Sequence, residues 1–132
     1  TPKAYDVRVA QMKKTTALLD YIHTNYASPI TAAALAKANY ISESHLCRSF
    51  KSAVGMPLTQ YVNRLRMEKA AVLLRNTDED ISAVARSVGI EDLGYFDRLF
   101  RRAAGMSPGA YRRAADKAES SEKRASATVL PT

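Results

Sequence analysis

Residues 46–56 read LCRSFKSAVGM, and residues 96–106 read FDRLFRRAAGM. These stretches decide the fold because they repeat one pattern: an apolar pair, an arginine between its members, and a closing Gly-Met. A short alanine-containing run comes before each stretch, at residues 34–38 and 83–87, and a tyrosine, Tyr61 or Tyr111, follows each. Such self-similarity indicates one supersecondary unit used twice.

Each repeat has the outline of a helix-turn-helix motif, in which a short helix and a longer helix flank a tight turn. Residues that favour helix ends stand where the helices of each repeat should begin and end. No segment alternates apolar and polar residues as a strand would. The chain is therefore predicted to be all-α, with about seven helices. The predicted N-caps are Thr31, Ser42, Asp80, Asp92 and Ser107, with a positive-φ helix end at Gly55 and another helix end near Gly105.

The predicted organisation has five parts along the chain. They are a linker over residues 1–8, a first helix-turn-helix subdomain over 9–56, a linker helix over 57–76, a second subdomain over 77–115 and a disordered tail over 116–132. The first helix should begin near Val9 and place Met12 and Ile22 on its apolar face. At about 1.5 Å per residue, a linker helix of about eighteen residues spans roughly 27 Å. Adjacent major-groove faces of DNA lie roughly 34 Å apart, so such a rod suits two readers in successive grooves.

The chain is basic. Its 132 residues include 20 Lys and Arg against 13 Asp and Glu, a net charge of +7. This excess favours a polyanionic partner, either nucleic acid or an anionic membrane surface. The alternative is a solvated basic surface with no partner. No apolar run approaches the roughly 18 residues that span a bilayer, so no membrane contact of that kind is predicted.

The reactive side chains are few. One cysteine excludes an intrachain disulfide and a cysteine-rich zinc site, and two separated histidines give no metal-ligand spacing, so no cofactor is predicted. No nucleophile–base arrangement supports an enzyme. The cysteine count suits a reducing compartment, and we expect a cytoplasmic protein. The sequence begins Thr1-Pro2-Lys3, which indicates a fragment of a larger protein. Core and rim positions are predicted for Tyr21, Tyr26, Tyr40, Tyr61, Tyr95 and Tyr111.

The candidate DNA-reading faces lie on the longer helix of each repeat, because the major groove of B-DNA admits one α-helix. Arg48 and Arg98 occupy equivalent positions, where each can fork onto guanine or grip phosphate. Asp97 can accept from a cytosine amino group or orient Arg98 or Arg101, and the orienting role is favoured. Cys47 is interpreted as a small side chain tolerated near bases. The full candidate set is Ser42, Glu43, Ser44, Cys47, Arg48 and Lys51 in the first repeat, and Leu93, Gly94, Asp97, Arg98 and Arg101 in the second.

The chain resembles the AraC/XylS family of bacterial transcription regulators from about Lys14 to Arg113. Residues 41–51 with the glycine at 55 resemble the family's first recognition helix, residues 64–74 resemble its linker helix, and residues 81–112 resemble its second half. Ile90 and Gly94 depart from the family's usual Phe and Ser. The departure at Gly94 removes a side chain from the reading face and should loosen the start of that helix.

The resemblance implies a two-subdomain module that binds double-stranded promoter DNA. It also implies a preceding domain for sensing or dimerisation, and RNA polymerase as a further partner. By position, the implied base readers are Ser44, Cys47 and Arg48, and in the second helix Leu93, Gly94, Asp97 and Arg98. A rival hypothesis is a basic helical protein-interaction module that contacts an acidic partner.

Overall fold

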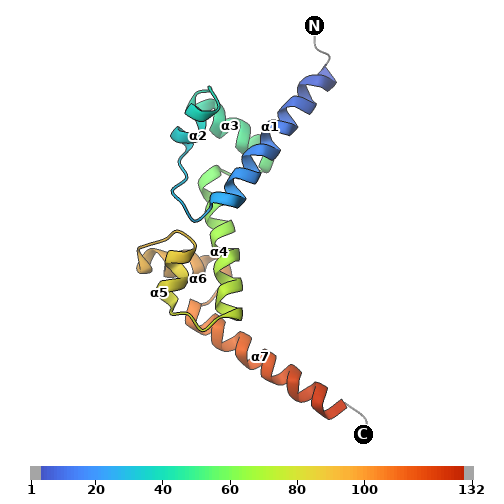
Figure 1. The fold of residues 1–132 in the computed structure, drawn as a ribbon, viewed down its shortest axis with the longest axis vertical. Coiled ribbons are helices and arrows are strands. Elements are labelled where there is room, and N and C mark those ends of the chain that lie inside the picture. The colour runs from blue at the N-terminus through green and yellow to red at the C-terminus, as the bar shows by residue number, and fades with distance from the viewer. Residues whose placement is uncertain (1–3, 130–132) are drawn as a thin grey trace. The chain divides into compact units, whose positions relative to one another are not determined.

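The computed structural model describes the backbone of residues 4–129 and the side chains of residues 10–121. This part of the chain contains seven helices and no strand, which confirms the all-α prediction (Figure 1). The helices are α1 (Ala4–Asn25), α2 (Ala32–Ala38), α3 (Glu43–Val54), α4 (Leu58–Asn76), α5 (Ile81–Ser87), α6 (Leu93–Ala104) and α7 (Pro108–Val129). They form two compact units, Thr1–Arg66 and Met67–Thr132, whose boundary falls within α4.

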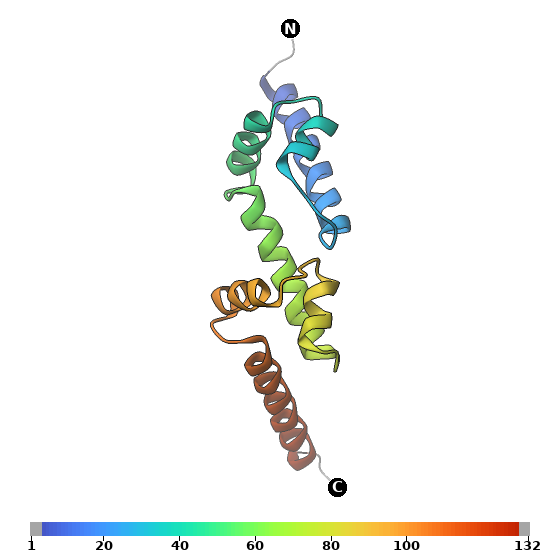
Figure 2. The same ribbon diagram turned by 90° about the vertical axis from the view of Figure 1, so that its left-hand side faces the viewer.

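The first unit is built around the α2–α3 pair, which packs with α1 and the start of α4 (Figures 1 and 2). Arg66 closes this unit from α4, because its Nε donates to the carbonyl of Tyr26 at 2.7 Å and its Nη2 to that of Ser28 at 3.0 Å. The guanidinium thereby pairs two backbone carbonyls of the turn that follows α1. The buried core of the unit consists of Ile22, Leu35, Ala36, Leu46, Phe50, Leu58, Val62 and Leu65.

The second unit repeats this plan with α5, α6 and the start of α7 around the end of α4. Arg112 of α7 donates from Nε to the carbonyl of Leu74 at 3.0 Å and from Nη1 to that of Glu79 at 2.6 Å. These bonds join the first turns of α7 to the end of α4 and the loop after it. The buried apolar residues of the unit are Met67, Ala70, Leu74, Val84, Ala85, Val88, Ile90, Phe96 and Phe100.

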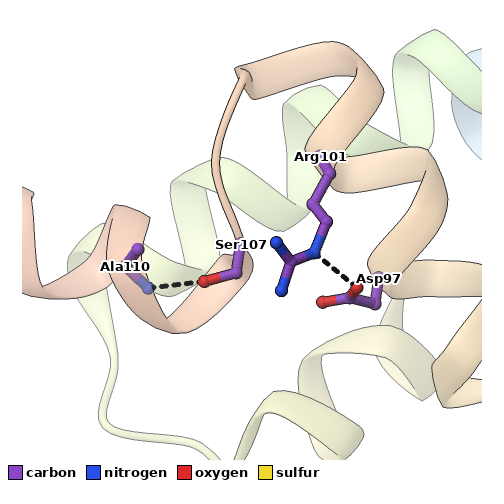
Figure 3. Close-up of polar contacts among 4 residues, drawn as sticks. All are labelled: Asp97, Arg101, Ser107 and Ala110. Atoms are coloured by element: carbon purple, nitrogen blue, oxygen red, sulfur yellow. Dashed lines mark hydrogen bonds and ion pairs between the residues drawn. The ribbon is translucent and has the colours of Figure 1, made fainter.

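Side-chain capping follows the sequence prediction at four of the five positions. The four side-chain oxygens accept from Ala34 N at 3.1 Å (Thr31), His45 N at 3.0 Å (Ser42), Tyr95 N at 3.0 Å (Asp92) and Ala110 N at 3.1 Å (Ser107; Figure 3). The prediction for Asp80 is wrong in part. Its carbonyl accepts from Val84 N at 3.0 Å, as at any helix start, but its side chain makes no capping hydrogen bond. Asp80 is exposed, so water can hydrate the carboxylate and the first amides instead.

The turns of the two repeats need the same backbone conformation but use different residues. Gly55 (φ 92°) and Gly105 (φ 77°) end α3 and α6 in the left-handed region. Within the helix-turn-helix turns, Gly89 has φ 93°, whereas the matching residue of the first repeat is Tyr40, with φ 57°. Tyr40 is also 96% exposed, so its predicted place in the core or rim is wrong.

Two helices run further than the sequence predicted. The helix α1 begins at Ala4, within the predicted linker, and Met12 is 68% exposed and not part of an apolar face. The helix α7 continues to Val129, whereas it was expected to fade after Ala115 into a disordered tail. Residues 116–129 contain no Gly or Pro and are rich in helix-favouring Ala, Glu and Lys, so nothing local stops the helix. Residues 1–3 and 130–132 of the predicted linker and tail lie outside the described residues.

Candidate nucleic-acid interface

The outward face of α3 matches the prediction. Its inward residues, Leu46 and Phe50, are 4% and 2% exposed and fix the rotation of the helix. The opposite face is open to solvent along its whole length. Ser42, at the start of α3, uses its hydroxyl to cap the helix. The predicted site residues Ser42, Glu43, Ser44, Cys47, Arg48 and Lys51 are all exposed.

The outward face of α6 is set in the same way, by Phe96 and Phe100 at 0% and 1% exposure. Leu93 is 45% exposed although it is apolar. Asp92 caps α6, Leu93 is the first residue of the helix and Gly94 is the second. The predicted site residues Leu93, Gly94, Arg98 and Arg101 are exposed, and Asp97 is partly exposed.

Asp97 and Arg101 form an ion pair one turn apart on this face, with 2.6 Å between Oδ2 and Nε (Figure 3). This geometry agrees with the predicted role of Asp97 in orienting an arginine, and the arginine that it holds is Arg101. Arg98 takes another partner, since its guanidinium carbon lies 5.9 Å from the centre of the Tyr95 ring. A cation at this distance from an aromatic face is weakly attracted to it, so the contact with Tyr95 favours one position of the Arg98 side chain without fixing it.

The matching face of α3 has no such pair. Cys47 stands where α6 has Asp97, and Lys51 stands where α6 has Arg101. Arg48 and Lys51 therefore have no carboxylate partner on α3 one turn toward the N-terminus. Cys47 is an exposed free thiol. The buried faces of the two helices are alike, whereas their outward faces differ in chemistry.

Matched aromatic contacts hold each recognition helix from behind. The Tyr61 ring meets Phe50 edge-on, with ring centres 5.6 Å apart, and the Tyr111 ring meets Phe100 in the same way at 5.4 Å. Each tyrosine hydroxyl has a partner from another helix. His23 Nε2 lies 2.7 Å from the hydroxyl of Tyr61, and Arg75 Nη1 donates to that of Tyr111 at 2.8 Å. The sequence reasoning missed both partners, because neither precedes its tyrosine at a helical spacing.

Two further findings concern other kinds of site. In residues 10–121 no three His, Cys, Asp or Glu side chains come together as a metal site would require. No helix in the described part of the chain is both long enough and apolar enough to cross a bilayer.

A family model described as a helix-turn-helix domain matches residues 35–114, a range that contains α3, α4, α5 and α6 in full. The chain belongs to the AraC-type helix-turn-helix family. This confirms the AraC/XylS resemblance. The relatives that the AraC-type chain matches are named as transcriptional regulators, which agrees with the prediction that it is not an enzyme.

Among curated relatives, the AraC-type chain is 39% identical over 97 residues to the transcriptional regulator YijO of Escherichia coli strain K12, covering 74% of this chain and 34% of that protein. It is 34% identical over 99 residues to the transcriptional activator RhaS of Escherichia fergusonii, covering 75% and 36%. The chain thus spans about a third of the length of these relatives.

Among solved structures, the C-terminal domain of AraT, a response regulator from Geobacillus stearothermophilus, superposes with a TM-score of 0.72 at 33% identity, covering 76% of this AraC-type chain and 84% of that one. The DNA-binding domain of the transcriptional factor AdpA, solved in complex with a target DNA, gives a TM-score of 0.72 at 27% identity, covering 76% and 90%.

Proposed function

We propose that this chain is the sequence-specific DNA-binding domain of an AraC-type transcription regulator, and that α3 and α6 enter major grooves of promoter DNA. The carrying observation is the repeated architecture of the two helices. Each buries an aromatic-containing pair on one side and exposes an arginine, Arg48 or Arg98, on the other. The similarity to the AdpA domain, which was solved with its target DNA, supports the same reading.

The proposed mechanism divides the work between two kinds of contact. Lys and Arg around the helix starts and on α4 neutralise phosphates and set the register, which gives affinity without sequence information. Arg48 and Arg98 read base edges, where a guanidinium matches the two acceptors of guanine. The net charge of +7 supports the first part, and the lack of a carboxylate on α3 one turn before Arg48 supports the second.

We infer that the two helices occupy successive major grooves of one site. The length of α4 supports this inference: its 19 residues span about 28 Å at the usual rise. A single chain would then read two half-sites. Helix-turn-helix proteins with one recognition helix per chain read two half-sites by forming dimers. Because the outward faces of α3 and α6 differ, we expect the half-sites to differ in sequence.

The decisive experiment compares Arg48→Ala with the parent chain on a selected site and on random DNA. Loss of a base contact should cost about 1–3 kcal/mol on the selected site and little on random DNA. Lys117→Ala, which removes an equal charge from an exposed position of α7, is the matched control and should change both affinities equally. Equal losses for Arg48→Ala on both DNAs would make Arg48 a phosphate contact.

Salt dependence tests the electrostatic half of the mechanism. The logarithm of affinity should fall steeply with the logarithm of salt concentration, as expected for several phosphate contacts. A flat dependence would reject that half. A gel shift with competitor DNA also separates this proposal from the rival protein-interaction module, since that module would retain no specific DNA even at low salt.

We further propose that the domain works in the cytoplasm beside a separate sensing or dimerisation domain and contacts RNA polymerase. Two comparisons support the separate domain and the polymerase contact. The curated relatives are about three times as long as the matched segment, and one of them, RhaS, is named a transcriptional activator. Co-purification of RNA polymerase with the full-length regulator on a promoter fragment would test the polymerase contact.

A further inference from the structure

Asp97 is the single carboxylate within α6, and it lies on the face proposed to meet DNA. A carboxylate there repels phosphates and lowers affinity for every sequence. Its presence needs a reason, because Arg98 and Arg101 on the same helix would bind a polyanion more strongly without it. The surroundings of Asp97 supply that reason.

The two carboxylate oxygens of Asp97 are used differently. Arg101 Nε donates to Oδ2 at 2.6 Å, which compensates the negative charge and fixes the carboxylate (Figure 3). Oδ1 accepts no hydrogen bond from any side chain or backbone group that the structure describes. The Asp97 side chain is 39% exposed, so the carboxylate is open to a ligand from solvent while Oδ2 holds Arg101.

We propose that Asp97 determines sequence specificity by accepting a hydrogen bond from the amino group of a cytosine in the major groove. This inference rests on the proposed function and deepens it. Guanine and thymine present acceptors in the major groove, which a carboxylate oxygen repels, and adenine places an acceptor beside its amino group. Cytosine offers its amino donor alone. A compensated carboxylate therefore selects cytosine against three other bases.

The first repeat provides the internal control. Cys47 occupies the position of Asp97, and Lys51 that of Arg101. A thiol is a weak acceptor, so this position of α3 should not select cytosine. The two outward faces then differ in the base that they demand at matched places, which agrees with unequal half-sites.

The test is selection of DNA sites from a random pool by the 132-residue chain and by Asp97→Ala, Asp97→Asn and Cys47→Ala variants. The parent should fix a cytosine at one position, and replacing that C·G pair by T·A should weaken it about ten-fold or more. Asp97→Ala should lose the preference at that position only. Asp97→Asn should shift it toward adenine, which an amide binds through two hydrogen bonds. Cys47→Ala should keep the cytosine.

The outcomes separate this inference from the proposed function. If the parent enriches a site and both Asp97 variants keep its base frequencies at every position, Asp97 only braces Arg101 and the inference is overturned. A uniform change in affinity for all four bases would overturn it too. If the parent enriches no sequence, the proposed function fails and the inference fails with it.

Discussion

The ring of Tyr61 stands edge-on to that of Phe50, with centres 5.6 Å apart and planes at 72°. Phe50 is the innermost side chain of α3, at 2% exposure, and Tyr61 lies on α4. The recognition helix is therefore held by an aromatic contact from the next helix along the chain. Tyr111 and Phe100 repeat the contact at 74° in the second unit. Edge-to-face pairs of this kind add about 0.5–1.5 kcal/mol beyond their buried area.

Two replacements of Tyr61 distinguish the contribution of its ring to stability from that of its hydroxyl. Tyr61→Phe keeps the contact with Phe50 and loses only the hydrogen bond with His23, which is partly open to water, so the free energy of unfolding should fall by about 0.5–1 kcal/mol. Tyr61→Ala also removes the ring and should cost about 2–4 kcal/mol. Urea denaturation measures both.

The matched control for the hydroxyl is Tyr111→Phe, which loses the bond from Arg75 in the second unit. We expect a similar small loss. A loss for Tyr61→Phe as large as that for Tyr61→Ala would contradict the assignment of most of the stabilisation to the ring.

The turn residue Tyr40 should be replaceable with a gain in stability. Its φ of 57° places an L-residue in the left-handed region, at a cost of about 1–2 kcal/mol, and its exposed ring has little packing to offset that cost. Tyr40→Gly relieves the strain but raises the entropy of the unfolded chain, so we expect a net gain of about 0.5–1 kcal/mol. The midpoint of thermal unfolding should rise accordingly.

Gly89 provides the reciprocal test, because it holds the same turn position with φ 93°. Gly89→Ala should destabilise the chain by about 1 kcal/mol or more. Stabilisation by that substitution would show that the two turns are not equivalent.

Capping gives a prediction with its control inside the same unit. The Asp92 carboxylate accepts from Tyr95 N at 3.0 Å, whereas the Asp80 side chain caps nothing. Asp92→Ala should therefore cost about 1 kcal/mol of unfolding free energy, and Asp80→Ala a few tenths at most. Equal losses in chemical denaturation would mean that charge at the helix N-terminus, not the hydrogen bond, carries the effect.

Local features of this fold were predictable from sequence. The caps at Ser42 and Asp92 and the end at Gly55 depend on residues within one turn of one another. The buried pairs of α3 and α6 follow from helical spacing alone. The same rule exposes Arg48 and Arg98 on the opposite side.

Contacts between distant segments were not predictable in this way. Arg66 donates to the carbonyl of Tyr26, which lies 40 residues earlier in the chain. Arg112 donates to that of Leu74, 38 residues earlier. No helical spacing rule indicates either hydrogen bond. The left-handed Tyr40 was missed because a tyrosine in a turn ordinarily avoids positive φ, and only the comparison with Gly89 explains its position. The Asp97–Arg101 pair lies between these cases: its i, i+4 spacing allowed the ion pair, but only the geometry shows that the carboxylate pairs with Arg101 and not with Arg98.

The end of α7 should contribute little to stability. Every side chain from Asp116 to Ser121 is exposed, so this part of the helix buries little apolar surface in its unit. A chain ending at Asp116 should keep its free energy of unfolding within about 0.5 kcal/mol of the parent. Its far-ultraviolet circular dichroism should lose helical signal. A large loss of stability in urea would reveal a packing role for the end of α7.

Leu93 should read the methyl group of a thymine. It is 45% exposed at the first position of α6, one turn before Asp97, and an apolar side chain on a reading face can discriminate thymine by contact with its C5-methyl group. Replacing that thymine by uracil removes only the methyl group, and burial of one such group is worth about 0.8 kcal/mol, so the parent should bind roughly four-fold more weakly. Leu93→Ala should bind the two DNAs equally, while its unfolding free energy stays within about 0.5 kcal/mol of the parent because the side chain is exposed.

Uracil at thymines outside the selected site serves as the control. If Leu93→Ala remains as sensitive to uracil as the parent, the methyl group is read by a different residue.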